Sequence, residues 1–345
     1  MAIYIGIVII LLSSAVVIYT SGLNSKNKDI IFLSGSFFVL ATISSLRSYT
    51  VGTDTKNYIS IFMKYVYGYN DSHSEIGYSM FNKLISIISD NPNAIIIASS
   101  IVVTFGIVLF IYKNSTKPWL SVYLYITMYY YFFSFNYVRQ YLALVFIINS
   151  WNYLKKEKYL KFALLVSIGT MFHTTALIGF SLIVIYKFRR KLTIIPVIFT
   201  GAFLILININ RLLDFIFTYF PRYRWYDGAY LNKTGGIMIV ILYFCIFIVA
   251  WLLKPRNYNE DYNLFLIFSA YSAALSILGN ELYIFVRPSL YINIFMIVLI
   301  PRIIDRFNYK DRHLLVAILC TVSFLYMLYY FNHNWHDVLP YEVFF

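Results

Sequence analysis

Charged residues are scarce in this chain: Asp, Glu, Lys and Arg make up only 12% of its 345 residues, whereas 60% are hydrophobic. A soluble globular domain carries roughly 25% charged residues, and a disordered chain has few apolar ones. The composition therefore excludes both classes. Cysteine is also rare, and Cys245 and Cys320 each lie inside an apolar run. This placement favours plain burial over a disulfide or a reactive thiol.

Separate soluble segments are missing as well, and we find no low-complexity tract and no internal repeat. Residues 1–20 lack a basic start and a small-residue cleavage site, so we expect the first apolar run to remain as an anchor. The sequence predicts a single integral membrane domain, residues 1–345.

Long apolar runs recur from one end of the chain to the other, and the mean hydropathy is +0.70. A hydrocarbon core of about 30 Å requires about 20 apolar residues per helix, so these runs predict an all-α, polytopic membrane protein. We place the spans near residues 1–22, 30–46, 94–112, 119–135, 138–154, 160–187, 192–209, 236–253, 262–280, 287–304 and 312–331.

Lys and Arg are divided unequally between the loops. Of the 28 basic residues, 18 lie in the loops 23–29, 113–118, 155–161, 187–191, 254–262 and 302–312. Cytoplasmic loops carry an excess of Lys and Arg. We therefore expect these loops inside, and both termini and the long loops 47–93 and 208–235 outside. The net charge of +13 is then a topology signal and not a sign of nucleic-acid binding.

This alternation holds only if residues 160–187 cross twice. Each half would have about 14 residues and a length of about 21 Å, too short for a core of about 30 Å. We expect a short broken hairpin that enters from the cytoplasm, with its buried tip at Phe172, His173 and Thr174. The chain then makes about 12 crossings.

The first outer loop opens with Arg47 and continues through Gly52-Thr53-Asp54-Thr55 to Tyr58. The glycine predicts a tight turn that places Asp54 beside Arg47; a solvated turn with a helix N-cap at Thr53 or Asp54 is the alternative. Residues 71–92 contain Glu75, followed by apolar residues at helical spacing: Met80, Phe81, Leu84, Ile85, Ile87 and Ile88. This pattern predicts an amphipathic helix in the outer interface.

Polar residues also occur at the outer ends of later spans. A short turn carries Asn136, Arg139 and Gln140, which favour a polar cavity over simple snorkelling of the arginine. His173 lies at the hairpin tip, where an ionisable group is costly, so we expect either a functional histidine or one bonded to a nearby carbonyl. Zinc binding is disfavoured because no second His or Cys lies nearby. Arg287 heads the span 287–304, while Arg222–Tyr230 and His333–Asp337 interleave charges with aromatic rings.

Together these residues resemble the EpsG family of exopolysaccharide polymerases, the Wzy-type enzymes that join lipid-linked repeat units. The resemblance is carried by Arg47, Gly52-Thr53-Asp54-Thr55, Tyr58, Glu75-Ile76-Gly77-Tyr78, Asn136, Arg139-Gln140, Ala143, Phe172-His173 and Pro340-Tyr341. The segment 208–235 and the tail histidines carry no part of it.

The resemblance implies a multi-pass glycosyltransferase of GT-C-like architecture, with its active site facing outward from the bacterial cytoplasmic membrane. Its donor would be a growing glycan on undecaprenyl diphosphate, and its acceptor a single lipid-linked repeat unit of an O-antigen, a capsule or an exopolysaccharide. Further implied partners are membrane lipid, a chain-length regulator and a flippase. No cofactor and no nucleic acid are implied.

Glycosyl transfer needs a base for the acceptor hydroxyl and positive charge for the departing diphosphate. His173 is the favoured base, with Asp54 as its orienting partner or as a substrate ligand; the reverse assignment stays open. Arg47, Arg139 and Arg287 are the candidates that bind the diphosphate, because a guanidinium fork fits phosphate oxygens. The predicted substrate-binding set is completed by Tyr58, Glu75, Asn136 and Gln140. No metal site is predicted.

Three other functions compete with this one. A flippase for lipid-linked oligosaccharides would also bind a diphosphate, but it should carry charges along a central cavity. A ligase shares the chemistry entirely and differs only in its acceptor. An acyltransferase could use His173 but would need an acyl donor from the cytoplasm.

Overall fold

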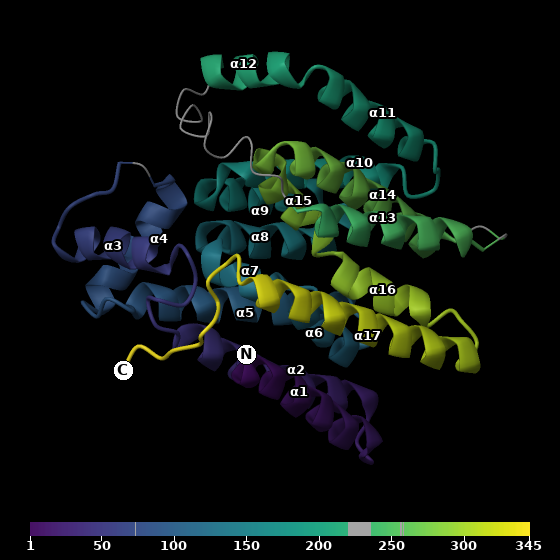
Figure 1. The fold of residues 1–345 in the computed structure, drawn as a ribbon, viewed down its shortest axis with the longest axis horizontal. Coiled ribbons are helices and arrows are strands. Elements are labelled where there is room, and N and C mark those ends of the chain that lie inside the picture. Colours follow the sequence, from purple (N-terminus) through teal and green to yellow (C-terminus); the bar gives the residue numbers. More distant parts are fainter. Residues whose placement is uncertain (73, 220–235, 256, 258) are drawn as a thin grey trace. The chain divides into compact units, whose positions relative to one another are not determined.

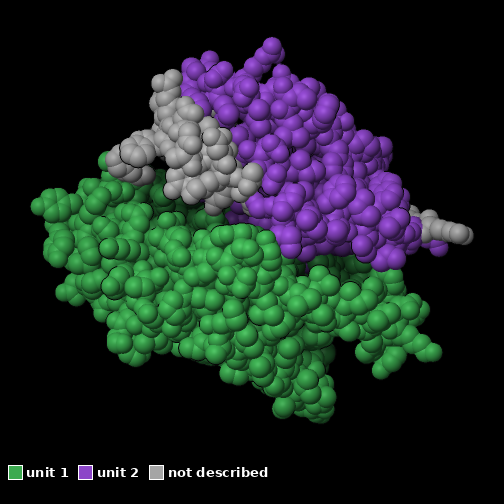
Figure 2. All heavy atoms as spheres, viewed as in Figure 1, with its two compact units in different colours: residues 1–177, 297–345 green, residues 178–296 purple. Residues whose placement is uncertain are grey.

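The computed structural model describes residues 1–345 except 73, 220–235, 256 and 258. Within this part, all regular secondary structure is helical apart from an isolated bridge between Arg47 and Val343. The chain forms two compact units (Figure 2): unit 1 comprises residues 1–177 and 297–345, and unit 2 comprises residues 178–296. The single domain over 1–345 stays a prediction, because two compact units can still belong to one membrane domain.

Figure 1 shows the helices of both units. Unit 1 holds α1 (Ala2–Thr20), α2 (Ser25–Ser45), α3 (Thr55–Val66), α4 (Ile76–Ile88), α5 (Ala94–Asn114), α6 (Pro118–Thr127), α7 (Tyr130–Asn136), α8 (Val138–Leu154), α9 (Tyr159–Phe172), nearly all of α16 (Met296–Ile304) and α17 (Tyr309–His333). The 3-10 helix η1 (Thr174–Phe180) leads into unit 2. Unit 2 holds α10 (Ser181–Lys187), α11 (Ile194–Ile207), α12 (Ile209–Tyr219), α13 (Ile237–Leu252), α14 (Glu260–Glu281), the 3-10 helix η3 (Tyr283–Phe285) and α15 (Val286–Asn293).

Several helices have the length and composition of membrane spans. Among the described residues there are six: α1, α2, α5, α14, the α15–α16 segment and α17, or seven if α11 and α12, bent by 77°, form one span. An all-helical, multi-pass membrane protein is thus confirmed. The number of about 12 crossings stays a prediction, because it includes helices such as α8 and α13 that are shorter than a standard span.

The centre of unit 1 is formed by α6, α7 and α8, whose side chains are almost all buried. The outer helices α1 and α17 instead expose apolar side chains, among them Ile9, Val17, Ile318 and Leu325. Apolar surface on this scale is suited to contact with lipid, as expected for helices that pack within a membrane.

The predicted span 119–135 is not one continuous helix. Tyr129 adopts φ 71, a left-handed conformation, and separates α6 from α7. Its ring packs against Phe132, Tyr330 and Phe331, with centroids 4.9, 4.6 and 5.6 Å away. Strained backbone of this kind persists where the surrounding packing fixes it. The run of apolar residues from 119 to 135 continues through Tyr129, so it does not predict this break in the helix.

The predicted break in residues 160–187 is confirmed at its position. Helix α9 ends at Phe172, His173 is extended with φ −157 and ψ 123, and η1 begins at Thr174. The two arms belong to different units, so their return to the same side as a hairpin stays a prediction.

Segments of unit 1 that the sequence assigns to opposite membrane faces lie at opposite ends of its helices. One end joins residues of the predicted outer face: Tyr4 donates to the carbonyl of Val338, Ser48 to that of Glu342, and Asn136 to that of His336. The other end joins predicted cytoplasmic residues: Asn114 contacts Lys155 and Arg302, and Lys117 pairs with Asp305. We call the first the outer-segment end. The arrangement matches the alternation that the basic residues predict.

Candidate functional site

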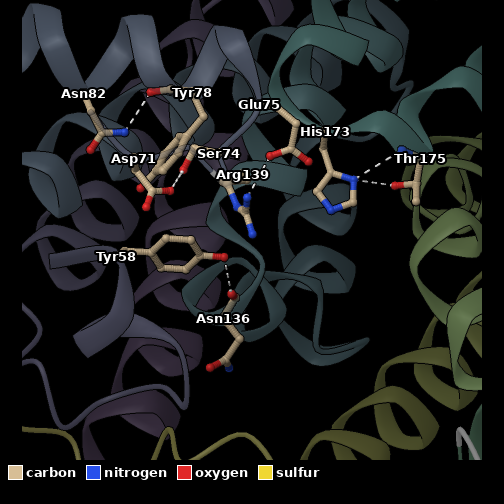
Figure 3. A network of polar contacts seen from close by, with 10 residues as sticks. All are labelled: Tyr58, Asp71, Ser74, Glu75, Tyr78, Asn82, Asn136, Arg139, His173 and Thr175. Carbon is tan, nitrogen blue, oxygen red and sulfur yellow. Dashed lines mark hydrogen bonds and ion pairs between the residues drawn. The ribbon is translucent and has the colours of Figure 1, made fainter. Parts of the chain in front are cut away.

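Five side chains selected from the sequence gather at the outer-segment end of unit 1. Figure 3 shows Tyr58 of α3, Glu75 at the start of α4, Asn136 at the end of α7, Arg139 at the start of α8 and His173 after α9. Their positions in the chain span more than 100 residues. The fold therefore brings together a polar cluster that the sequence could only suggest.

The centre of this cluster is an ion pair between Arg139 and Glu75. The guanidinium Nη1 lies 2.7 Å from the carboxylate Oε2, and the two side chains are 25% and 14% exposed. Arg139 also lies over the ring of Tyr78, with its Cζ 5.9 Å from the centroid. Its Nε is buried and has no hydrogen-bond partner. The guanidinium thus keeps donor capacity and partial exposure, which suits an anionic oxygen.

Helix α4 reaches this position through a close approach at Gly77. A Cβ atom on Gly77 would lie 2.8 Å from the backbone carbon and oxygen of Met171, which is closer than real Cβ contacts. Only glycine allows this contact. The approach sets the start of α4, with Glu75, against the end of α9, which precedes His173 (Figure 3).

Asn136 connects the cluster to two other segments. Its side-chain oxygen accepts from Thr53 at 2.8 Å, its backbone oxygen accepts from the Tyr58 hydroxyl at 3.0 Å, and its Nδ2 donates to the carbonyl of His336 at 3.1 Å. These bonds use both ends of the amide. Asn136 therefore positions Tyr58 and the turn at Thr53.

The turn at Gly52 has the form that the sequence predicts. Gly52 adopts φ +97, and its N–H donates to the carbonyl of Asp337 at 2.7 Å. Asp54 is the N-cap residue of α3, although its side chain makes no capping bond, and its carboxylate is half-buried. Asp54 thus occupies the N-cap position that the alternative assigned to Thr53 or Asp54, and the solvated turn of that alternative stays a prediction.

Among the described contacts, Arg47 forms no ion pair with Asp54, so their placement side by side stays a prediction. The Arg47 side chain is 2% exposed and donates to the carbonyl of Ser44, to Ser100 Oγ at 3.1 Å and to the carbonyl of Phe135 at 3.4 Å. Burial lowers the pKa of Arg47 to about 10, so it remains charged at neutral pH. A buried cation needs such partners. These acceptors belong to α2, α5 and α7, so Arg47 connects three helices.

His173 is 8% exposed, and its ring is held by Thr175. The Thr175 hydroxyl lies 2.7 Å from Nδ1, and the Thr175 backbone N–H donates to Nδ1 at 3.3 Å. Sequence reasoning overlooked this threonine. A hydroxyl two residues after a histidine at a helix end was the available signal, because side chains at this spacing commonly bond locally.

The C-terminal tail also reaches the site and was only partly foreseen. Carbonyls of His336 and Asp337 bind Asn136 and Gly52. The His336 ring packs against Tyr129, Phe133 and Tyr137, with centroids 6.2, 5.0 and 5.9 Å away. Burial lowers the pKa of His336 to about 4, so the ring is neutral at pH 7. Because every residue has a backbone carbonyl, the sequence does not show which carbonyls of the tail accept hydrogen bonds.

The remaining predicted residues lie elsewhere. Gln140 is 2% exposed in α8, next to Arg139. Arg287 is in α15 of unit 2, so its convergence with Arg47 and Arg139 stays a prediction. The segment Arg222–Tyr230 lies outside the described residues. Within the described part of the chain, no three His, Cys, Asp or Glu side chains are grouped closely enough to hold a metal ion.

Comparison with protein families identifies the chain. The EpsG family matches residues 30–343, which includes every residue of the cluster. The chain belongs to the EpsG family. This is a family of Wzy-type polysaccharide polymerase-like membrane proteins. Searches among curated proteins and among solved structures found no match.

Proposed function

We propose that this EpsG-family protein is a polysaccharide polymerase that joins undecaprenyl-diphosphate-linked repeat units at the outer face of the bacterial cytoplasmic membrane. The observation that carries the proposal is the gathering of Tyr58, Glu75, Arg139 and His173 at one end of unit 1. A partly exposed arginine, a carboxylate and an imidazole at such a place supply what glycosyl transfer from a diphosphate requires.

Arg139 is the residue that we assign to the diphosphate. Its side chain is 25% exposed, whereas Arg47 is 2% exposed and donates to protein acceptors. Charge stabilisation of a leaving group is often the largest catalytic contribution. Arg287 remains a further candidate for the same diphosphate. Glu75 orients Arg139 and can accept from a sugar hydroxyl.

The acid–base chemistry is assigned to His173 and Asp54. His173 follows the end of α9 that packs against the start of α4, where Glu75 lies, and Asp54 begins the helix that carries Tyr58. A positioned base contributes about 10² to 10⁴ in rate. One of the two takes the proton of the acceptor hydroxyl as that oxygen attacks the anomeric carbon.

The outward orientation is supported by the opposite end of unit 1, where Lys117 and Lys155 lie. Basic residues mark the cytoplasmic side, so the site would face outward. Helix α4 adds support because it exposes Ile76, Met80, Leu84, Ile87 and Ile88, one face of the helix, while Gly77, Tyr78 and Asn82 are buried. An exposed apolar face beside a polar site suits the outer lipid interface.

A deletion in the host organism tests the proposal. Loss of the chain should abolish high-mass glycan while single repeat units accumulate on the lipid or at the cell surface, and the intact gene should restore the polymer. Repeat units that accumulate on the cytoplasmic side would indicate a flippase. Long glycan that stays on undecaprenyl diphosphate without further transfer would indicate a ligase.

A further inference from the structure

We propose that Thr175 is a positioning residue that fixes the proton of His173 on Nε2, so that His173 acts in glycosyl transfer as a hydrogen-bond donor and Asp54 takes the acceptor's proton. This inference rests on the proposed function. It assigns distinct roles to two residues that sequence reasoning could not separate.

The geometry at Nδ1 carries the inference. A backbone N–H can only donate, and that of Thr175 points to Nδ1 at 3.3 Å. A neutral imidazole has one acceptor nitrogen and one N–H, so an Nδ1 that accepts leaves the proton on Nε2. The Thr175 hydroxyl lies 2.7 Å from the same nitrogen and can donate to it when Nδ1 carries no proton. The backbone contact therefore favours the tautomer with its proton on Nε2, and the hydroxyl contact is compatible with that tautomer.

The surroundings of the ring agree with a donor role. Figure 3 shows Nδ1 turned towards Thr175 and the second ring nitrogen, Nε2, turned away from it. The backbone at His173 is extended after α9 ends, which lets the ring bond forward to residue 175. A nitrogen that already carries a proton cannot accept one. It can donate to an anionic oxygen.

In the proposed glycosyl transfer, the acceptor hydroxyl oxygen forms a bond to the anomeric carbon, and its proton passes to the Asp54 carboxylate. The bond between the anomeric carbon and the diphosphate oxygen breaks, and its electron pair stays on the diphosphate. His173 Nε2–H and Arg139 donate hydrogen bonds to that departing anion, which lowers the barrier.

Substitutions at His173 separate a donor from a base, because glutamine places its amide nitrogen about where Nε2 lies and asparagine about where Nδ1 lies. The assay uses membrane vesicles with equal amounts of each variant and lipid-linked repeat units extracted from host cells that lack the protein. We expect His173→Gln to elongate glycan within about tenfold of the wild-type rate, and His173→Asn and His173→Ala to fall by about 100-fold.

Substitutions at Thr175 test the positioning role. Thr175→Val removes the hydroxyl at nearly constant volume and should slow elongation by about fivefold, whereas Thr175→Ser should stay within about twofold of wild type. In the His173→Gln background Thr175→Val should add nothing further, because an amide has no tautomers. Thr170→Val is the matched control, since the Thr170 hydroxyl bonds only the Ser167 carbonyl of its own helix.

The outcomes are distinct. If the wild-type protein elongates glycan and the His173→Gln variant does not, the donor role is wrong and His173 is again the candidate base. If Thr175→Val elongates glycan at the wild-type rate, the role of Thr175 is wrong. It is also wrong if Thr175→Val lowers the elongation rate as much in the His173→Gln background as it does alone. If the wild-type protein itself fails to elongate any glycan, the proposed function fails instead.

Discussion

Arg47 and Arg139 are both arginines at the outer-segment end of unit 1, yet their surroundings give them different properties. Arg47 is 2% exposed and donates to two backbone carbonyls and a serine, so it connects α2 with α5 and α7. Arg139 is 25% exposed, and the Glu75 carboxylate balances its charge. A ligand can share the second guanidinium but cannot reach the first without displacing protein acceptors.

This difference leads to a prediction for Arg139→Lys. Lysine keeps the charge but loses the planar fork that binds two phosphate oxygens, so glycan elongation should fall by about 10-fold or more while the protein still accumulates in the membrane. The measurement is glycan chain length on a gel at matched protein level. Arg211→Lys, at an exposed position of α12, is the control and should be neutral. Equal activity of Arg139→Lys and wild type would remove Arg139 from the diphosphate site.

At this scale much of the cluster could be predicted from the sequence. Tyr58, Glu75, Asn136, Arg139 and His173 stand out because polar and ionisable residues are costly beside apolar spans. Thr175 and the carbonyls of His336 and Asp337 could not be found in this way. A threonine is common in any sequence, and every residue has a backbone carbonyl.

Among the elements, the contact between α4 and α9 decides whether the cluster forms. It depends on Gly77, where a Cβ atom would approach the Met171 backbone to 2.8 Å. Backbone atoms cannot move aside as a flexible side chain can. The helices must separate if residue 77 carries any side chain.

We therefore expect Gly77→Ala to lower the free energy of unfolding by about 1 to 3 kcal/mol, as overpacking usually does. It should also reduce elongation, because Glu75 would move with α4. Thermal unfolding in detergent, followed by tryptophan fluorescence, measures the first effect. Gly35→Ala in α2 is the control, since nothing lies within 4 Å of the added Cβ. If Gly77→Ala matches this control in both stability and activity, α4 does not depend on the close approach.

Most helices could be predicted from apolar runs, with ends shifted by a few residues. Some shifts have identifiable causes: α2 starts at Ser25 and α14 at Glu260 because Asn24 and Asn259 cap them with side-chain oxygens. The break at Tyr129 had no such signal. Its left-handed backbone is fixed by aromatic packing with α17, a contact between residues about 200 positions apart.

For the molecule as a whole, the distribution of basic residues is the strongest sequence signal. It predicts which loops share a membrane face, and the two ends of unit 1 follow that division. The division into two compact units could not be predicted, because apolar runs report contact with lipid and not which helices pack together.

The orientation can be tested by labelling single cysteines with a reagent that does not cross membranes. In a protein with Cys245→Ser and Cys320→Ser, we expect Ser72→Cys to react in intact cells, since Ser72 is exposed in the loop 47–93. Ser25→Cys, at the exposed first residue of α2, is the control and should react only after permeabilisation. The reverse pattern would place the site on the cytoplasmic side and contradict the proposed orientation.

The most direct test of the central claim is to measure glycan length with purified protein in lipid vesicles supplied with undecaprenyl-diphosphate-linked repeat units from the host. The account predicts that wild-type protein converts single units into a ladder of longer lipid-linked glycans and releases undecaprenyl diphosphate. Arg139→Lys and His173→Ala should leave mostly single units. A wild-type protein that forms no ladder, or a His173→Ala protein that forms the same ladder, would contradict the claim that this cluster polymerises glycans.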